Sequence, residues 1–353
     1  MNSYEQVVSE KLERLRSQRK FNLLAIESSC DETAASVLTS EREVRSMAVH
    51  TQIPLHQRYG GVVPEIASRS HVERIGGVVR YALEDAKMSM EDIDAVAVTC
   101  GPGLVGALLV GVSYAKGLAF ARQLPLIGVN HIAGHIAANY ISHKELEPPF
   151  VCLVASGGHS HIVEVGDYSQ FRLIGCTRDD AAGEAFDKVA RVLGLPYPGG
   201  PHLEKLALSG DENAFSLHAG FNAKPILDFS FSGLKTAVIN LMHNAEQTGR
   251  ELNKADVAAS FQRAVVDTLV TKSVNAAMEA GHGKLVLAGG VSANTVLRNR
   301  LRVAAEAKGI AFYCPEMKYC TDNAAMIGCA GYYGLLGGQS SSLNLNANPA
   351  LAL

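Results

Sequence analysis

The sequence has little charge of either sign and no cysteine pattern that would cross-link it. Charged residues make up 19% of its 353 residues, and 32 Lys and Arg stand against 35 Asp and Glu, a formal charge of −3. This balance excludes a strongly basic nucleic-acid binder, so any RNA contact has to use a local basic patch. The seven cysteines contain no C-x-x-C spacing, which excludes a zinc ribbon and is typical of reduced thiols in the cytosol. We therefore expect a cytoplasmic protein.

Long hydrophobic runs are also missing. The most apolar region, residues 95–127, is interrupted by two prolines and by Lys116 and Arg122, so we expect no membrane span. The first 20 residues carry five Lys or Arg and three Glu. They lack the apolar core of a signal peptide, and we interpret them as a solvated helical extension.

Three common site motifs are absent or incomplete. The phosphate-binding pattern G-x-x-x-x-G-K-[ST] occurs nowhere. Residues 101–106 match G-x-G-x-x-G, but no acidic residue between Asp94 and Glu145 is available to hold a ribose, which disfavours a nicotinamide or flavin site. Residues 131–135 read H-I-A-G-H, and Ile132 stands where zinc proteases of the H-E-x-x-H type have their general base.

What the chain does contain is the same arrangement twice. Residues 21–38 and 150–165 each read as an apolar strand, a polar tip and a second strand. Later in each half, at 93–121 and 284–301, an apolar strand runs through glycine into a helix. Helical stretches at 70–87 and 257–280 lie between these features. The pattern predicts an α/β protein of two duplicated lobes that face each other across a cleft.

The composition indicates where the parts begin and end. The polar, proline-containing segment 143–149 separates the halves. We assign 1–20 to the extension, 21–149 to the first lobe and 150–321 to the second, with the helix after about 322 packing back on the first lobe. The end of the chain, 338–353, is rich in Ser and Asn and has no periodicity, so we expect it to be poorly ordered.

One candidate site uses histidines. If 131–142 is helical, His131 and His135 lie one turn apart on one face, a spacing that can hold a metal ion. Asp322, just ahead of an apolar helix, is a candidate third ligand. Both features have ordinary alternatives: the histidines could be simple polar residues, and an Asp at such a position commonly caps a helix.

Other candidates would bind anions or hydroxyl groups. The small residues of 155–160 and 288–294 can bring backbone N–H groups close to a phosphate, although plain tight turns explain them as well. Asp180, Glu184 and Asp187 recur at helical spacing, more carboxylates than capping requires, and a rigid Gly/Pro loop follows at 197–201. These carboxylates suit ribose hydroxyls or a metal.

Taken together, ten ordered blocks resemble the tRNA N6-adenosine threonylcarbamoyltransferases, the TsaD family once labelled O-sialoglycoprotein endopeptidases. The blocks are E-S-S-C-D-E-T-A (27–34), G-G-V-V-P-E-I-A-S-R (60–69), G-P-G-L-V-G-A-L-L-V-G (101–111), H-I-A-G-H (131–135), S-G-G-H (156–159), D-D-A-A-G-E-A-F-D-K (179–188), Y-P-G-G-P (197–201), F-S-F-S-G-L-K-T (229–236), A-G-G-V-S-A-N (288–294) and C-T-D-N (320–323). The resemblance implies an actin-like ATPase (ASKHA) fold with two RNase H-like lobes.

The resemblance also implies a reaction and a set of site residues. The threonylcarbamoyl group of threonylcarbamoyladenylate passes to N6 of the adenosine 3′ to the anticodon, position 37, in tRNAs reading codons that begin with A, and AMP leaves. The matching metal ligands are His131, His135 and Asp322, with one Fe²⁺ expected and Zn²⁺ as the alternative. The matching substrate-binding residues are Val154, Ala155, Ser156, Gly157, Gly158, Asp187, Gly200 and Asn294.

Two departures from the common family pattern are visible. Ala133 replaces an acidic residue inside the histidine motif, and Ser160 replaces a Thr after S-G-G-H. Neither is a metal ligand by the resemblance, so the predicted function stands. The implied partners are tRNA, a TsaB-like paralogue and a TsaE-like small ATPase. The competing hypotheses are a metallopeptidase and a non-catalytic nucleotide-binding scaffold.

Overall fold

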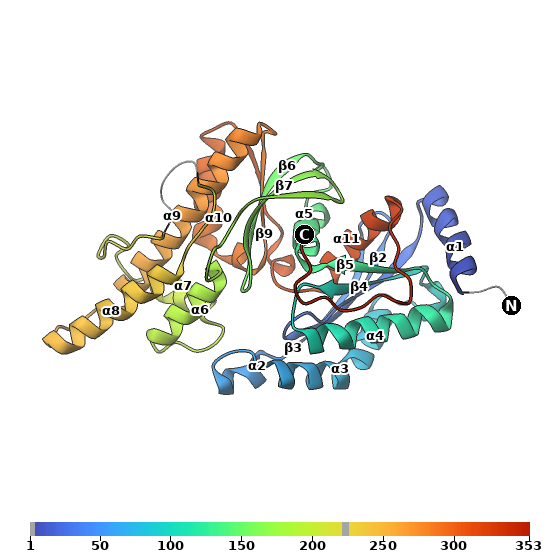
Figure 1. The fold of residues 1–353 in the computed structure, drawn as a ribbon, viewed down its shortest axis with the longest axis horizontal. Helices are drawn as coiled ribbons and strands as arrows, with labels where there is room; N and C mark the ends of the chain where they lie inside the picture. The colour runs from blue at the N-terminus through green and yellow to red at the C-terminus, as the bar shows by residue number, and fades with distance from the viewer. Residues whose placement is uncertain (1–3, 221–225) are drawn as a thin grey trace.

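Two five-stranded sheets with the same topology organise the molecule (Figure 1). A computed structural model describes residues 4–220 and 226–353. The first sheet has the order β3-β2-β1-β4-β5 and the second the order β10-β9-β6-β7-β8. The strands are β1 (Asn22–Glu27), β2 (Glu32–Thr39), β3 (Val44–Thr51), β4 (Ala95–Gly101), β5 (Leu126–Asn130), β6 (Phe150–Ala155), β7 (Ser160–Asp167), β8 (Gln170–Cys176), β9 (Lys284–Ala288) and β10 (Ala311–Tyr313).

The pairing within the sheets confirms the predicted duplication. β1 pairs antiparallel with β2 and parallel with β4, and β6 pairs antiparallel with β7 and parallel with β9. The two predicted hairpins are therefore the first two strands of each sheet. β1 and β6 read as continuous apolar runs because both of their faces are covered, as is usual for central strands with helices on either side.

The helices stack with the sheets into layers. They are α1 (Tyr4–Gln18), α2 (Ile53–His56), α3 (Pro64–Asp85), α4 (Val105–Arg122), α5 (His131–Ser142), α6 (Ala182–Val192), α7 (Gly199–Ala207), α8 (Ser232–Thr248), α9 (Lys254–Ala280), α10 (Thr295–Glu306) and α11 (Ala324–Leu336), with short 3₁₀ turns η1 (Gln57–Tyr59), η2 (Met90–Asp92), η3 (Gly290–Ala293) and η4 (Met317–Tyr319). α3 and α4 cover the outer face of the first sheet, while α9 and α10 pack on the outer side of the second, with α6 and α7 packed in turn against α9.

A central layer joins the halves. Alternate residues of β1 point in opposite directions: Leu24 and Ile26 face α3 and α4, whereas Leu23 and Ala25 face α11. The same inner core continues through α5 to the apolar residues of β6 and β9. The chain passes from the first sheet to the second between α5 and β6, and α11 then returns to the first sheet. The two lobes therefore share one core on the side of α5 and α11 (Figure 1).

The N-terminal helix is not a wholly solvated extension, which corrects the prediction. Val8, Leu12 and Leu15 of α1 are buried, and the Tyr4 hydroxyl donates to the Leu124 carbonyl at 2.8 Å. The spacing of these three side chains gives α1 one apolar face. That face packs into the core layer around α11.

α4 is, among residues 4–220 and 226–353, the one helix long and apolar enough to cross a membrane by length and composition alone. A core helix of a globular protein passes the same test. α4 packs against β4 and α3 through buried residues that include Leu108, Val112 and Ala119. Burial of this face explains part of its composition, and apolar side chains on its other face, such as Leu109 and Phe120, are exposed.

The expectation of a poorly ordered end for 338–353 is wrong. Ser341 N donates to the Leu126 carbonyl at 2.7 Å, and Asn348 N donates to the Cys100 carbonyl at 2.8 Å. A Cβ at Gly101 would lie 2.0 Å from the Asn348 carbonyl oxygen, so the segment runs in close contact with the end of β4. Backbone groups make these two bonds, and the Ser341 hydroxyl accepts a third from Gly128 N at 3.0 Å. Contacts of this kind with distant strands are not visible in a Ser- and Asn-rich composition.

Candidate active site

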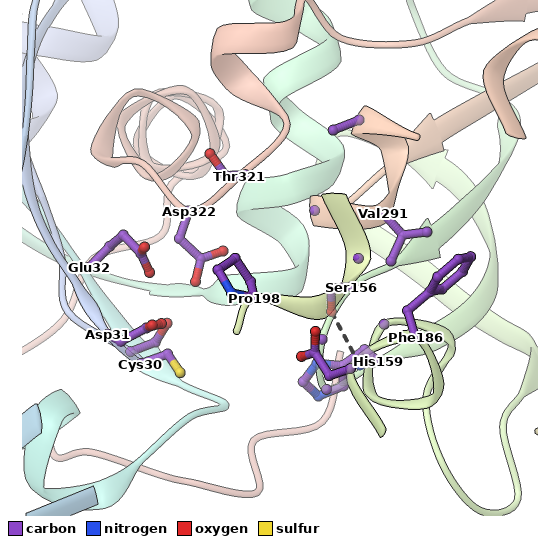
Figure 2. Close-up of a pocket in the computed structure, with 18 of the residues that line it drawn as sticks. Cys30, Asp31, Glu32, Ser156, His159, Phe186, Pro198, Val291, Thr321 and Asp322 are labelled. Atoms are coloured by element: carbon purple, nitrogen blue, oxygen red, sulfur yellow. Dashed lines mark hydrogen bonds between the residues drawn. The ribbon is translucent and has the colours of Figure 1, made fainter. Parts of the chain in front are cut away.

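The polar tips of the two equivalent hairpins face the same cleft (Figure 2). β1 ends at Glu27 and β6 at Ala155, and the residues just after each strand line a cavity of about 490 Å³ between the lobes. Cys30, Asp31 and Glu32 come from the first tip, and 156–159 from the second. A cleft at the carboxyl ends of central strands is the usual ligand site of open α/β sheets.

The structure brings His131, His135 and Asp322 together on the first-lobe side of this cleft. His131 opens α5, His135 lies one turn later, and their ring centroids are 4.6 Å apart. Asp322 Oδ1 lies 3.2 Å from His135 Nε2 and 3.5 Å from His131 Nε2. Ligand atoms of all three residues lie within 4.8 Å of one another. The predicted helical spacing of the histidines is confirmed.

Asp322 is not the cap of the helix that follows it. The cap is Asn323, whose side-chain oxygen accepts a hydrogen bond from Met326 N at 3.0 Å. The Asp322 carboxylate is therefore free to point at the imidazoles. The capping alternative considered for this residue is wrong because the next residue takes that role.

The electrostatics of the cluster favour a cation. Burial alone would lower the pKa of His131, but the Asp322 and Glu27 carboxylates raise it to about 9. Burial resists ionisation of Asp322, and the two imidazoles outweigh it and hold the pKa of that carboxyl below its usual range. Burial lowers the pKa of His135, so its ring stays neutral and able to bind a metal.

A metal ion fits these residues. Two imidazoles and one carboxylate with open positions form a ligand set that suits Fe²⁺ and Zn²⁺. Both ring nitrogens of His135 are buried without a hydrogen-bond partner, including Nε2, which faces Asp322, whereas an ordinary core histidine would have both nitrogens satisfied. The donor chemistry thus supports a metal site rather than a pair of structural histidines.

The residues predicted to bind substrate fall into two groups. Ser156, Gly157, Gly158, Asp187, Gly200 and Asn294 line the cleft. Val154 and Ala155 do not: both are fully buried in β6, with neighbours in β7 and β9. The prediction placed the start of the loop within the strand, and it omitted His159, which does line the cleft.

Of the three candidate carboxylates, Asp180 just before α6 and Glu184 and Asp187 on it, only Asp187 lines the cleft. Asp180 and Glu184 each lie 2.7 Å from Lys188 Nζ, so they form an ion-paired cluster on the helix surface. Asp187 Oδ1 accepts a hydrogen bond from Gly199 N at 2.7 Å. Its carboxylate therefore fixes the start of α7 beside the cleft, where Gly200 lies.

Sequence reasoning assigned no role to several cleft residues of the first lobe. Figure 2 shows Asp31 and Glu32 near Asp322. Burial, followed by the charges of Asp31 and Asp322, raises the pKa of Glu32 to about 10. Tyr197 of the second lobe reaches toward Asp31, its hydroxyl 3.4 Å from Oδ2. The equivalence of the two hairpin tips was a signal that could have singled out the Cys-Asp-Glu segment.

Two like lobes of RNase H type around a ligand cleft define the actin-like ATPase fold, and solved structures share it. The chain resembles HypF in its phosphate- and nucleotide-bound form with a TM-score of 0.60 and 17% identity, over 90% of this chain and 47% of that one. It resembles component A of the Acidaminococcus fermentans (R)-2-hydroxyglutaryl-CoA dehydratase with a TM-score of 0.53 and 15% identity, over 89% of this chain and 99% of that one. At this identity the likeness concerns the fold.

Within that fold the chain belongs to the tRNA N6-adenosine threonylcarbamoyltransferases, since the TsaD family model matches residues 43–329. It is 55% identical over 336 residues to the enzyme of that name from Clostridium botulinum strain Kyoto. The match covers 95% of this chain and 99% of that enzyme. It is also 56% identical over 331 residues to the Clostridium perfringens ATCC 13124 enzyme of the same name, and the match covers 94% of this chain and 98% of that enzyme. The chain is thus a transferase of tRNA threonylcarbamoylation, and the peptidase and scaffold hypotheses are not favoured.

Proposed function

We propose that the cleft binds threonylcarbamoyladenylate and passes its threonylcarbamoyl group to N6 of adenosine 37 in tRNAs reading codons that begin with A, with AMP as the leaving group. The observation that carries the proposal is the arrangement across one cleft. A His-His-Asp cluster on the first lobe faces a glycine hairpin tip on the second. One side suits the reacting carbonyl, and the other suits the phosphate.

The second lobe holds the adenylate. Ser156 Oγ accepts a hydrogen bond from His159 N at 3.1 Å, which shapes the tip, and a Cβ at Gly157 or at Gly158 would point into open space with no atom within 4 Å. Phosphate oxygens can therefore approach the backbone N–H groups at this tip. Asp187 and Gly200 bind the ribose, and Asn294 binds near the base. Phe186 and Val291 supply an apolar wall for the adenine (Figure 2).

His131, His135 and Asp322 hold the metal, which we propose to be one Fe²⁺, with Zn²⁺ as the alternative. When bound, the ion supplies Lewis-acid polarisation of the carbamoyl oxygen. Elemental analysis of protein purified without added metal identifies it. An iron or zinc content near one per chain supports the proposal, and a metal-free protein that is fully active contradicts it.

The chain's own residues mainly position the reactants. The mixed anhydride is already activated, so the main task of the protein is to align the weakly nucleophilic N6 amine with the carbamoyl carbon. A cleft lined from both lobes can hold the adenylate and the adenine base at once. The target adenosine lies in a loop, where an unpaired base is splayed out at lower cost than from a duplex.

We further propose cytoplasmic action in an assembly with a TsaB-like paralogue and a TsaE-like small ATPase. The free state of all seven cysteines agrees with a reducing compartment. Support for a protein partner comes from exposed apolar side chains on the outer layer of the first lobe, Val72 and Tyr81 on α3 and Leu109 and Phe120 on α4. A patch of this kind on adjacent helices is typical of a protein interface.

Replacing Val72 with aspartate is expected to weaken the complex with the paralogue at least about tenfold, because the charge would be desolvated in an apolar interface. Isothermal titration calorimetry with the purified paralogue measures the change. The matched control is Val303→Asp on α10, since the two valines are 65% and 68% exposed. Equal affinities of the two variants would remove α3 from the interface.

The test of the reaction is to incubate the chain with threonylcarbamoyladenylate, the two proposed partners and an A-codon tRNA, and to search the digested tRNA for the modified nucleoside by mass spectrometry. A tRNA with guanosine at position 37 is the control. Product on both tRNAs, or on neither, contradicts the proposal. A peptide-cleavage assay with and without chelator examines the old endopeptidase label, and we expect no chelator-sensitive cleavage.

A further inference from the structure

A buried carboxylate outside the metal cluster contacts one of its ligands. Glu27, the last residue of β1, has no exposed surface. Its Oε2 lies 3.1 Å from His131 Nδ1, the ring nitrogen on the side away from Asp322. A fully buried carboxylate is costly unless donors satisfy it, so its place behind His131 calls for an explanation.

Donors reach both oxygens of this carboxylate. Ser29 N donates to Oε1 at 2.5 Å, and the Thr99 hydroxyl donates to Oε2 at 2.6 Å. Because a carboxylate is an acceptor only, the contact with His131 requires the proton to sit on Nδ1. When the ring gives up one proton to bind a metal, the proton that stays is therefore the one on Nδ1, and the nitrogen left free is Nε2, which lies 3.5 Å from Asp322 Oδ1 and faces the cluster.

We propose that Glu27 is a positioning residue of the metal site: it fixes the Nδ1–H tautomer and the ring orientation of His131, so that Nε2 offers its lone pair to the ion. The proposal rests on the proposed metal site. It also explains why β1, apolar from Leu23 to Ile26, ends in a charged residue, since Glu27 is the residue of β1 whose side chain reaches His131, the first residue of α5. A carboxylate behind a ligating imidazole raises the basicity of the ligand as well as orienting it.

The other neighbour of the same nitrogen does not explain the tautomer. Ser29 Oγ also lies 3.1 Å from His131 Nδ1. A hydroxyl can donate or accept, so it is compatible with a proton on either ring nitrogen. Only the carboxylate restricts the choice to one tautomer.

Glu27→Gln is the decisive variant because it keeps the size of the side chain and replaces one hydrogen-bond acceptor, a carboxylate oxygen, with a donor, the amide NH₂. With its NH₂ toward His131, the amide donates to Nδ1 and drives the proton onto Nε2, the atom needed by the metal. Flipped over, the NH₂ meets the Ser29 N–H, another donor. Neither orientation reproduces the native hydrogen bonds.

The measurement is the Zn²⁺ affinity of the full-length chain by chelator competition, together with the visible spectrum of the Co²⁺-substituted protein. Glu27→Gln is expected to raise the Zn²⁺ Kd about 10- to 100-fold and to alter the Co²⁺ spectrum. The control is Ser36→Ala on β2, the strand paired with β1, which removes a buried hydrogen bond to the Ser46 carbonyl of β3 in the same sheet. Its Kd is expected to stay within about twofold of the wild type.

Long-range ¹H–¹⁵N correlation spectra of the Zn²⁺-loaded wild type report the tautomer of His131 directly and do not depend on the variant folding. A proton on Nδ1 with zinc on Nε2 supports the proposal. The reverse tautomer overturns it, as does a Glu27→Gln Kd equal to that of Ser36→Ala. A wild-type chain that fails to bind Zn²⁺, Co²⁺ and Fe²⁺ would instead overturn the metal site itself.

Discussion

Replacing His131 with alanine is expected to reduce formation of the threonylcarbamoylated nucleoside by about 10²- to 10⁴-fold, the range that corresponds to the several kcal/mol a Lewis acid contributes. The ring provides one of three donors that lie within 4.8 Å of one another, and two donors bind a divalent ion much more weakly. Product is quantified by mass spectrometry at saturating adenylate, and bound metal is measured on the same sample.

The fold is expected to survive this change. The alanine leaves Glu27 with the Ser29 and Thr99 donors, so the free energy of unfolding falls by about 1–3 kcal/mol. That loss is smaller than the ordinary stability of a globular protein. His282→Ala is the control, because His282 pairs with Glu164 at 2.7 Å in the second sheet region, away from the cleft. A folded His131→Ala protein with full activity and no bound metal would exclude the metal role.

The duplicated architecture could be predicted because its signals are local. Each hairpin is an apolar run interrupted by a polar tip, and each strand-to-helix junction contains glycine, so short windows of sequence carry the information. The cleft follows from the duplication, since equivalent tips of two facing lobes must meet. The pairing of β1 with β2 and of β6 with β7 confirms these predictions.

The features that sequence reasoning missed depend on contacts between distant residues. The contact of Glu27 with His131 joins positions 104 residues apart, and no motif in the sequence around either residue predicts it. The limits of the substrate loop shifted because the register of β6 continues through Ala155, paired with Ser160. Strand ends are the least predictable part of an element. The helical spacing of Val8, Leu12 and Leu15 is visible in the sequence, but the eight charged residues around them favoured the prediction of a solvated helix.

Removing residues 339–353 is expected to lower the free energy of unfolding by about 2–4 kcal/mol and to promote association between copies. β5 is the edge strand of the first sheet, and Ser341 covers it by donating to the Leu126 carbonyl and accepting from Gly128 N at 3.0 Å. Leu345 and Leu351 pack on the outer core. Each buried hydrogen bond contributes about 1 kcal/mol net and each leucine about as much when half buried, less the entropy of ordering the segment.

The association has a separate cause, since an uncovered edge strand can pair with another chain. Urea unfolding and light scattering measure the two effects.

A shorter truncation, of residues 347–353, separates the edge from the site. It keeps Ser341 on β5 but removes the Ala352 carbonyl, which accepts from Asn130 Nδ2 at 3.0 Å. The other side-chain atom of Asn130, Oδ1, caps α5 by accepting from Ile132 N at 2.8 Å, directly beside His131. With its amide no longer held, the cap loosens and the first ligand of the helix loses part of its orientation. The shorter truncation should therefore weaken Zn²⁺ binding while leaving the protein monomeric, whereas aggregation of this variant as severe as that of the longer one would show that the last seven residues, rather than Ser341, protect the edge.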